Sequence, residues 1–136
     1  MAFRPQDTRI YRPYPDAVPY DLLSAGGCDE DELAATLALD EIRVAKLDGR
    51  PVAAYALRAA TGRRYDLLAL GVAHGFRRRG LGRWMLGHAI GLAETQGGRE
   101  IFTRLPPVEG ARAARFLERL GFEPANDGLL LVLTPE

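Results

Sequence analysis

The chain has 136 residues, of which 47% are hydrophobic, a composition typical of a globular protein. This length suits one domain, so we expect a single domain over residues 1–136 that buries roughly two thirds of its unfolded surface. Its 18 basic residues balance 18 acidic ones, and the formal net charge is zero. No nucleic-acid partner is expected, because only a local basic site could hold an anion.

Cysteine content and hydropathy indicate where the protein works. Cys28 is the only cysteine, so no internal disulfide can form and no zinc cluster can be built. The segment from Met1 to Arg12 lacks the apolar core of a signal peptide, and no later apolar run is long enough to span a bilayer. We therefore expect a cytoplasmic protein with no metal site and no membrane partner.

The first forty residues predict short elements separated by proline and glycine. Thr8 to Arg12 favours a short strand, and Asp21 to Ala25 a short helix that ends at Gly26-Gly27. The acidic run Asp29 to Glu32 is typical of the first turn of a further helix, which would reach Leu39. A recruitment site for a cationic amine is the alternative interpretation of this run.

Three strands are predicted next. Glu41 to Leu47 and Pro51 to Arg58 flank Asp48-Gly49, a pair that strongly indicates a hairpin turn. Tyr65 to Val72 is a mostly apolar run suited to a central strand buried on both faces. Within it, Gly71 indicates either a bulge or the close approach of another backbone or a ligand.

The second half of the chain alternates helices and strands. Apolar residues recur at helical spacing from Leu81 until Gly97-Gly98. We then expect, in chain order, a strand (Glu100 to Arg104), an amphipathic helix (Val108 to Leu120) and two strands (Glu123 to Ala125 and Leu129 to Leu133). The fold class predicted from this order is α+β with a mostly antiparallel sheet.

A basic, glycine-containing loop lies between the central strand and the long helix. Its sequence is Arg77-Arg78-Arg79-Gly80-Leu81-Gly82. The first turn of a helix has unpaired N–H groups and a partial positive charge, and glycines let phosphate oxygens approach them. The loop therefore favours a pyrophosphate site, although a helix N-cap with surface arginines is the alternative. It is neither a Walker loop nor the dinucleotide-binding fingerprint.

Two motifs together resemble one family. The chain has a predicted strand, a loop with the pattern Arg-x-x-Gly-x-Gly (Arg77, Gly80, Gly82) and then a long helix. This arrangement is similar to the acetyl-CoA-binding motif of the GNAT superfamily of N-acetyltransferases. The run Ala113 to Phe122 resembles the family's last helix. The resemblance implies a three-layer fold with a twisted, mostly antiparallel sheet of about six or seven strands flanked by helices. It also implies acetyl-CoA as cosubstrate and a primary amine, in a small molecule or a protein, as acceptor.

The resemblance also implies site residues. Main-chain groups of Leu70, Gly71 and Val72 would hold the pantetheine arm, and the Val72 N–H would polarise the thioester carbonyl. Phe116 would lie near the thiol. The pyrophosphate would bind to the backbone of Arg77, Arg78, Arg79, Gly80, Leu81, Gly82 and Arg83.

Two residues are candidates for the base that deprotonates the amine. Asp66 lies six residues before Val72, where some histone-acetylating members carry a glutamate, and even spacing puts both residues on one face of a strand unless a bulge intervenes. A structural or solvated strand-end carboxylate is the alternative interpretation. His74 is the second candidate, because its ordinary pKa is nearer neutrality, and a surface histidine in the loop is the alternative interpretation.

The usual general acid is missing. Leu117 stands where relatives usually carry tyrosine, and Gly110 where they often carry asparagine. Tyr55, Tyr65 or His74 are the possible substitutes. A non-catalytic acetyl-CoA-binding regulatory module therefore remains the alternative function, and a nucleotide phosphate binder is a weaker one. The last strand could also pair two subunits into a homodimer.

Overall fold

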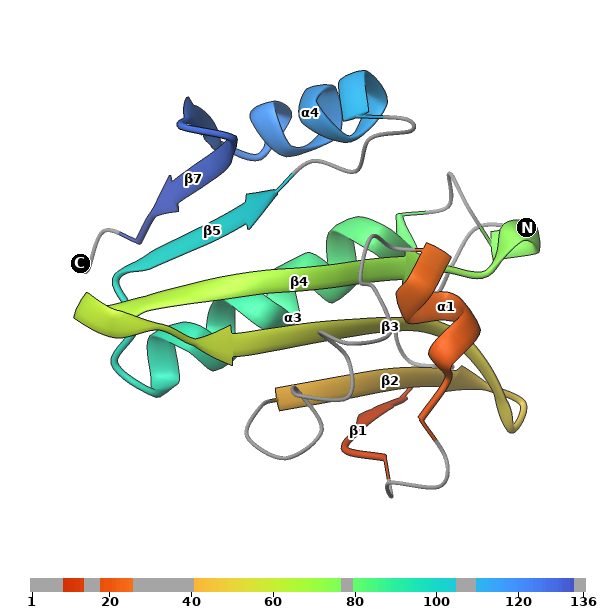
Figure 1. The fold of residues 1–136 in the computed structure, drawn as a ribbon. Helices are drawn as coiled ribbons and strands as arrows, with labels where there is room; N and C mark the ends of the chain where they lie inside the picture. The colour runs from red at the N-terminus through yellow and green to blue at the C-terminus, as the bar shows by residue number, and fades with distance from the viewer. Residues whose placement is uncertain (1–8, 14–17, 26–40, 77–79, 105–109, 134–136) are drawn as a thin grey trace.

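A seven-stranded sheet organises the parts of the chain that the computed structural model describes, residues 9–13, 18–25, 41–76, 80–104 and 110–133. The strands are β1 (Arg9–Tyr11), β2 (Glu41–Leu47), β3 (Arg50–Ala59), β4 (Arg64–Val72), β5 (Glu100–Arg104), β6 (Glu123–Ala125) and β7 (Gly128–Val132). The helices are α1 (Tyr20–Ala25), α3 (Leu81–Thr95) and α4 (Gly110–Arg119), with 3-10 turns η3 (Thr61–Arg63) and η4 (His74–Phe76). The strand order is β1-β2-β3-β4-β5-β7-β6 (Figure 1).

The predicted α+β class and the expected six or seven strands are confirmed. Every ladder is antiparallel except that of β4 with β5, which is parallel. The predicted helix that would reach Leu39, its acidic run from Asp29 to Glu32, and Val108 at the start of the last predicted helix lie outside the described residues. No helix in the described ranges has the length and apolarity needed to cross a bilayer.

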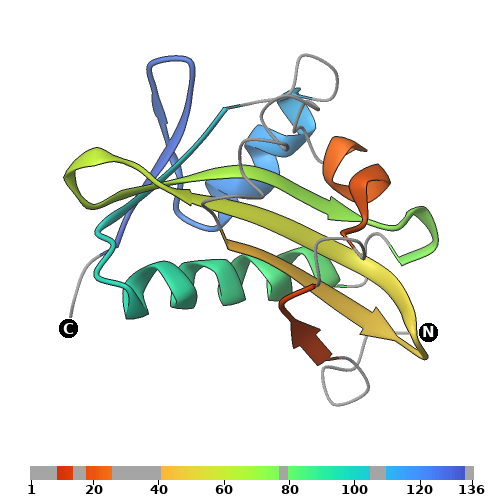
Figure 2. The same ribbon diagram turned by 60° about the horizontal axis from the view of Figure 1, so that its bottom comes forward.

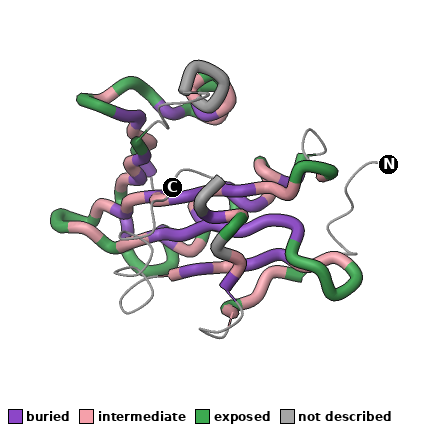
Figure 3. The backbone as a smooth tube through the Cα atoms, turned by 45° about the vertical axis from the view of Figure 1, so that its right-hand side comes forward, coloured by how far each residue is buried: buried purple, intermediate pink, exposed green. Residues whose placement is uncertain are grey.

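The hairpin between β2 and β3 forms where Asp48-Gly49 predicts it. Both turn residues have positive φ, 52° at Asp48 and 78° at Gly49, as the tight hairpin turn that matches strand twist requires. The following strand is continuously buried from Val52 to Leu57, which makes β3 one of the most enclosed strands of the sheet (Figure 3).

The sheet separates two hydrophobic cores. Tyr55 and Leu57 of β3 pack toward α3, whereas Ala54 and Ala56 belong to the second core with Leu23 of α1. Figure 2 shows α3 and α1 on opposite faces of the sheet. The face of α3 that is buried consists of Leu81, Met85, Leu86, Ala89 and Ala93. Alternating side chains on β3 thus serve both cores.

A bulge in β4 changes which side chains face each core. Ala56 pairs with Ala69 and Leu57 with Leu67, so Leu68 has no partner on β3. Before the bulge, Leu67 packs in the α3 core, and after it Ala69 packs in the α1 core. The extra residue reverses the alternation, so positions an even number apart across Leu68 lie on opposite faces.

Gly71 is required by the approach of α1. A Cβ atom built at Gly71 would collide with the main-chain carbonyl of Leu22. Helix α1 can therefore rest on β4 only because this position has no side chain. Of the two alternatives that the sequence left open here, the close approach of another backbone is confirmed, and the bulge lies at Leu68 instead.

The two central strands separate after a short parallel ladder, and we call this separation the fork. In the described chain, β4 pairs with β5 through Arg64–Asp66 and Glu100–Phe102. Beyond Asp66 and Phe102, β4 continues along β3 to Val72 while β5 follows β7 (Figure 1). At the base of the fork the buried hydroxyl of Thr103 donates a hydrogen bond to the Leu67 carbonyl, 2.9 Å away.

Candidate functional site

Residues from three elements meet at the start of α3. An ideal Cβ at Gly82 would lie 3.7 Å from Cγ2 of Val72 on β4 and 3.8 Å from Cζ of Phe116 on α4. Gly80 precedes the helix with φ 84° and accepts the first helical hydrogen bond from the Trp84 N–H at 3.0 Å. The sequence-predicted residues Val72, Gly80, Gly82 and Phe116 are thus brought together at one end of β4.

The start of α3 presents groups of the kind that bind anions in proteins. Helix α3 has 15 residues, so its first turn presents main-chain N–H groups and the positive end of a macrodipole. Leu81 is buried under the first turn, and Arg83 is exposed beside it. Arg77, Arg78 and Arg79, which belong to the same predicted site, lie outside the described residues.

Main-chain groups at the end of β4 point to alternate edges of the strand. The Ala73 N–H donates to the Val52 carbonyl of β3 at 2.8 Å. By the alternation of a strand, the main-chain groups of Leu70 and Val72 point toward the fork, and those of Gly71 toward β3. Leu70 and Val72 are therefore on the edge where a ligand in the fork would lie, whereas Gly71 accommodates α1.

Asp66 is the last residue of β4 that pairs with β5, and it lies on the face opposite α3. Its Oδ1 is 3.1 Å from Nε of Arg64 and its Oδ2 is 3.5 Å from Nη2 of Arg58. The prediction that even spacing places Asp66 and Val72 on one face is wrong, because the bulge at Leu68 intervenes. The carboxylate instead joins two arginines.

The remaining positions considered for proton transfer are His74, Leu117 and Gly110. His74 is exposed in η4, two residues beyond Val72. Leu117 is 6% exposed and packs in the α3 core, so its position offers no proton donor. Gly110 is the first residue of α4.

Both tyrosines are hydrogen-bonded far from the first turn of α3, Tyr55 to a residue within the helix and Tyr65 to the residue that caps its C-terminus. The Tyr55 hydroxyl lies 2.7 Å from Nδ1 of His88, and the Tyr65 hydroxyl donates to Oε1 of Gln96 at 2.8 Å. Burial raises the pKa of Tyr55 far above its ordinary value. Burial, followed by the charge of Arg43, lowers the pKa of His88. These hydroxyls fasten α3 to the sheet, so neither serves the meeting point at Gly82.

The same network reaches β2. Gln96 Nε2 donates to Oε1 of Glu41 at 3.3 Å, and Oε2 of Glu41 forms an ion pair with Nη1 of Arg43 at 2.8 Å. Burial by itself raises the pKa of Glu41, but the hydrogen bonds from Gln96 and Arg43 and the charge of Arg43 lower it on balance. The carboxylate is therefore held charged as a structural contact.

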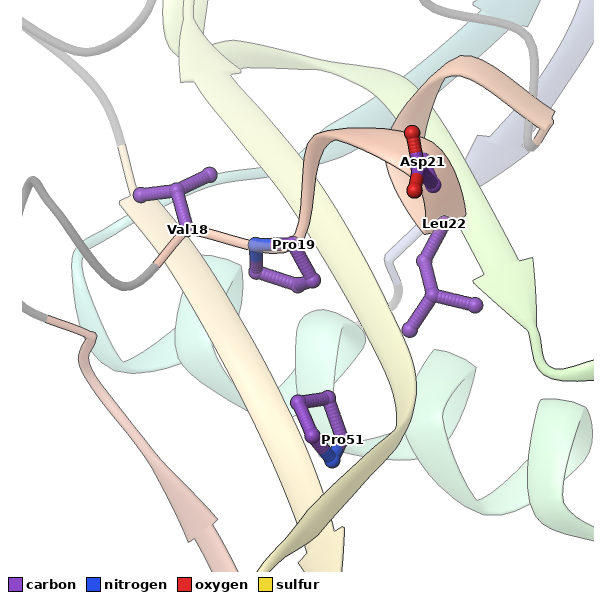
Figure 4. A pocket seen from close by; sticks show the side chains of 5 residues that line it. All are labelled: Val18, Pro19, Asp21, Leu22 and Pro51. Carbon is purple, nitrogen blue, oxygen red and sulfur yellow. The ribbon is translucent and has the colours of Figure 1, made fainter.

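A separate hollow of about 400 Å³ lies beside α1. Figure 4 shows its lining, which comes from Val18, Pro19, Asp21, Leu22 and Pro51. Asp21 is the one ionisable side chain among these five. These five described lining residues are mostly apolar and include no pair of groups suited to acyl transfer.

Sequence reasoning missed three residues at the fork. Thr103 alternates with Ile101 in β5, and a period of two could have placed its hydroxyl in the buried row. Arg58 and Arg64 are ordinary strand-end arginines in the sequence. Their convergence on Asp66 depends on pairing between β3 and β4, which local patterns do not encode.

Comparison with known sequences identifies the family. The model of the Acetyltransferase (GNAT) family matches residues 7–122, and the chain therefore belongs to the GNAT family of acetyltransferases. The predicted resemblance is confirmed over most of the chain. Comparison with curated proteins gave no match.

Solved structures share the fold. A GNAT family acetyltransferase from Elizabethkingia anophelis with acetyl-CoA bound gives a TM-score of 0.81 at 16% identity, covering 95% of this chain and 99% of the other. A Bacillus subtilis acetyltransferase in complex with CoA gives 0.79 at 16% identity, covering 93% and 98%. An IAA acetyltransferase from Bacillus cereus gives 0.77 at 22% identity, covering 88% and 79%. At these identities the likeness establishes the fold, and the acceptor must be argued from the site.

Proposed function

We propose that this protein transfers the acetyl group of acetyl-CoA to a primary amine by direct attack of the amine on the thioester. Membership of the GNAT family supports the acetyltransferase class. The relatives from Elizabethkingia anophelis and Bacillus subtilis, solved with acetyl-CoA and with CoA, support the cosubstrate.

The observation that carries the proposal is the position of Gly82. A glycine inside a helix costs roughly 1 kcal/mol relative to alanine. The chain's own packing does not require it, because a Cβ there would meet Val72 and Phe116 at ordinary contact distances. A ligand that presses against the first turn of α3 would explain the glycine. We assign the pyrophosphate to the backbone of Gly80, Leu81, Gly82 and Arg83, together with Arg77, Arg78 and Arg79.

The rest of acetyl-CoA would extend from this turn into the fork. Main-chain groups of Leu70 and Val72 point to that edge and would hold the pantetheine arm as a neighbouring strand would. Phe116, whose ring contacts the Gly82 position, would lie beside the phosphate end of the arm. The amine nitrogen then attacks the thioester carbonyl carbon, a C–N bond forms, and the C–S bond breaks. CoA leaves as a thiolate, and the nitrogen gives up its surplus proton.

Proton transfer needs little help on the thiol side. A thiol with a pKa near ~8.5 departs tolerably as thiolate, and water can protonate it. The amine side needs more, because an alkylamine with a pKa near ~10.4 is almost wholly protonated at neutral pH. His74 is exposed beyond the end of β4 and is available for this task. Asp66 is held by two arginines, which favours a positioning role over that of a base.

Leu117 supports one alternative function. It fills the core where relatives usually carry the proton donor, as expected of a module that binds acetyl-CoA without turning it over. Release of free thiol with any amine excludes this alternative. Binding of acetyl-CoA without thiol release across a broad panel of amines would establish it.

Calorimetric titration of acetyl-CoA tests the cofactor site. We expect micromolar binding to the wild type and its loss in Gly82→Asp, where a carboxylate would occupy the phosphate position. Gly87→Asp is the matched control, because Gly87 lies in the same helix, is exposed and has open space around it. Equal binding by the two variants would remove the start of α3 from the site. No binding by folded wild type would overturn the proposed function.

A further inference from the structure

Four side chains gather at the base of the fork on the face opposite α3, and we call them the fork cluster. They are Arg58, Arg64, Asp66 and Phe102. Asp66 pairs with Arg58 across β3–β4 and with Phe102 across β4–β5, so these three form a row over three strands. The Arg64 guanidinium lies over the Phe102 ring, 5.1 Å from its centroid. The aromatic ring and the carboxylate hold the two arginines in place.

The two arginines of the fork cluster have N–H donors that its ion pairs leave unused. One carboxylate faces two guanidinium groups, so the cluster has a formal charge of +1. The ion pairs engage Nη2 of Arg58 and Nε of Arg64, while each guanidinium has five N–H donors. The side chains of Arg58 and Arg64 remain 38% and 43% exposed. On the same face, Glu100 of β5 is the cross-strand partner of Arg64, but among the described ion pairs Arg64 is joined to Asp66 and not to Glu100.

The location of the cluster is as informative as its charge. Val72, Gly82 and Phe116 mark the proposed cofactor position on the α3 side of the sheet, whereas Asp66 and the two arginines lie on the opposite side. The fork is where the strands part and the two sides can meet. If acetyl-CoA occupies the α3 side of the fork, the side of the fork cluster is left for the amine.

We infer that the fork cluster binds a carboxylate of the acceptor, so that the acceptor is a primary amine that also carries a carboxylate. This inference rests on the proposed function and names its substrate class. A guanidinium is a planar fork of donors whose geometry matches a carboxylate. Surface ion pairs by themselves contribute little to stability, so the fold has small need of the second arginine.

The length of the fork limits the acceptor further. The part of β4 that borders the fork next to Asp66 is Leu68 to Leu70. These residues lie two to four positions along the strand from Asp66, roughly 7–13 Å away from it. An amine separated from its carboxylate by five methylene groups, roughly 7 Å long when extended, reaches the near end of this range, whereas an α-amino acid is too short. The carboxylate takes no part in the bond changes and serves to orient the nitrogen.

A pair of matched amines tests the inference through thiol release from acetyl-CoA. We would compare ε-aminocaproate with pentylamine, which lacks only the carboxylate, in wild type, Arg58→Gln and Arg64→Gln. We expect the wild type to have the lower KM for ε-aminocaproate, and each substitution to raise that KM by about tenfold while leaving that for pentylamine unchanged. Arg64→Lys should recover part of the loss, since it keeps the charge without the fork.

Arg99→Gln is the matched control. Arg99 is exposed just before β5. Its substitution removes the same charge near the fork from a residue that does not pair with Asp66. Equal KM values for the two amines in the wild type, or equal effects of Arg58→Gln and Arg99→Gln, would overturn the inference. γ-Aminobutyrate, with a shorter spacer, should have a higher KM than ε-aminocaproate.

Binding measurements separate this inference from the proposed function. Should no amine release thiol, ε-aminocaproate would be titrated by calorimetry into protein saturated with CoA, or into free protein if CoA does not bind. Binding to wild type that is lost in Arg58→Gln and Arg64→Gln supports the fork cluster as a carboxylate site. No binding to wild type overturns it, while the acetyl-CoA titration independently decides the cofactor assignment.

Discussion

The two faces of the sheet use their polar side chains differently. On the α3 face, Tyr55 is fully buried and hydrogen-bonded to His88, and Tyr65 is hydrogen-bonded to Gln96. On the opposite face at the fork, Arg58 and Arg64 share one carboxylate and stay partly exposed. On the α3 face the polar groups are hydrogen-bonded to one another and hold α3 against the sheet. At the fork the arginines keep N–H donors that a ligand could use.

The largest expected effect concerns the α1 face. Gly71→Ala should lower the free energy of unfolding by about 3 kcal/mol, because the new methyl group collides with the Leu22 carbonyl and must displace main chain. Urea denaturation measures the change. Gly75→Ala is the control, since nothing lies within 4 Å of a Cβ there. Equal stability of the two variants would show that α1 does not rest on β4 as described.

Thr103 joins the two arms of the fork, and its hydroxyl should matter next most. Thr103→Val keeps the shape but leaves the buried Leu67 carbonyl without its donor, so we expect a loss of about 2 kcal/mol. Thr103→Ser restores the hydroxyl and should recover most of this loss. Chemical denaturation compares the three proteins. A valine variant as stable as the wild type would mean that the hydroxyl does not hold the fork.

Gly82 distinguishes binding from folding on the α3 face. Both Gly82→Ala and Gly87→Ala should stabilise the protein by about 0.5–1 kcal/mol, because alanine favours a helix. Only Gly82→Ala should weaken acetyl-CoA binding, by about tenfold or ~1.4 kcal/mol, as its methyl group enters the proposed phosphate position. Thermal melts and calorimetry report the two quantities. Unchanged affinity in Gly82→Ala would count against the cradle.

The kinetics of an Asp66 variant distinguish a positioning role for this residue from the role of a general base. If Asp66 positions the arginines, Asp66→Asn should lower kcat for pentylamine by less than about tenfold at any pH. Loss of a general base typically costs about 100-fold or more. Thiol release measured from pH 6 to 9 separates the two roles. A large drop in kcat, with loss of the ionisation on its acidic limb, would restore Asp66 as the base.

The smallest expected effect is a pH dependence on the α3 face. Because burial lowers the pKa of His88 in the folded protein, the unfolded chain binds more protons as the pH falls below the ordinary value of 6.5. Stability should therefore decrease as the pH falls through that value and be fully present above it. His88→Gln should remove this part of the slope in denaturation midpoints. An identical slope in the variant would assign it to other groups.

Much of the fold could be predicted from the sequence, because it depends on local patterns. Asp48-Gly49 indicated the β2–β3 turn, apolar spacing from Leu81 indicated α3, and strand β5 was predicted with the bounds observed, Glu100–Arg104. Turn chemistry, helical period and strand length act over a few residues. The proposed phosphate-binding turn was predicted on the same grounds, from glycines and arginines that stand together in the chain.

The candidate acceptor side could not be predicted in this way. One unpaired residue, Leu68, turns Asp66 to the face opposite Val72, and nothing in the surrounding apolar run marks that bulge. Gly71 could be recognised as a place of close approach, but not that Leu22 is its neighbour. Register between strands arises from contacts that are distant in sequence.

The sequence by itself determined the family, the order of the elements and the turn proposed to bind acetyl-CoA, because each depends on residues that are adjacent or periodic. Only the tertiary structure decided that β4 and β5 part after Asp66 and Phe102, that Thr103 closes the base of the fork, and that Arg58 and Arg64 converge there. Strand pairing brings these groups together, and local preferences carry no information about which strands pair.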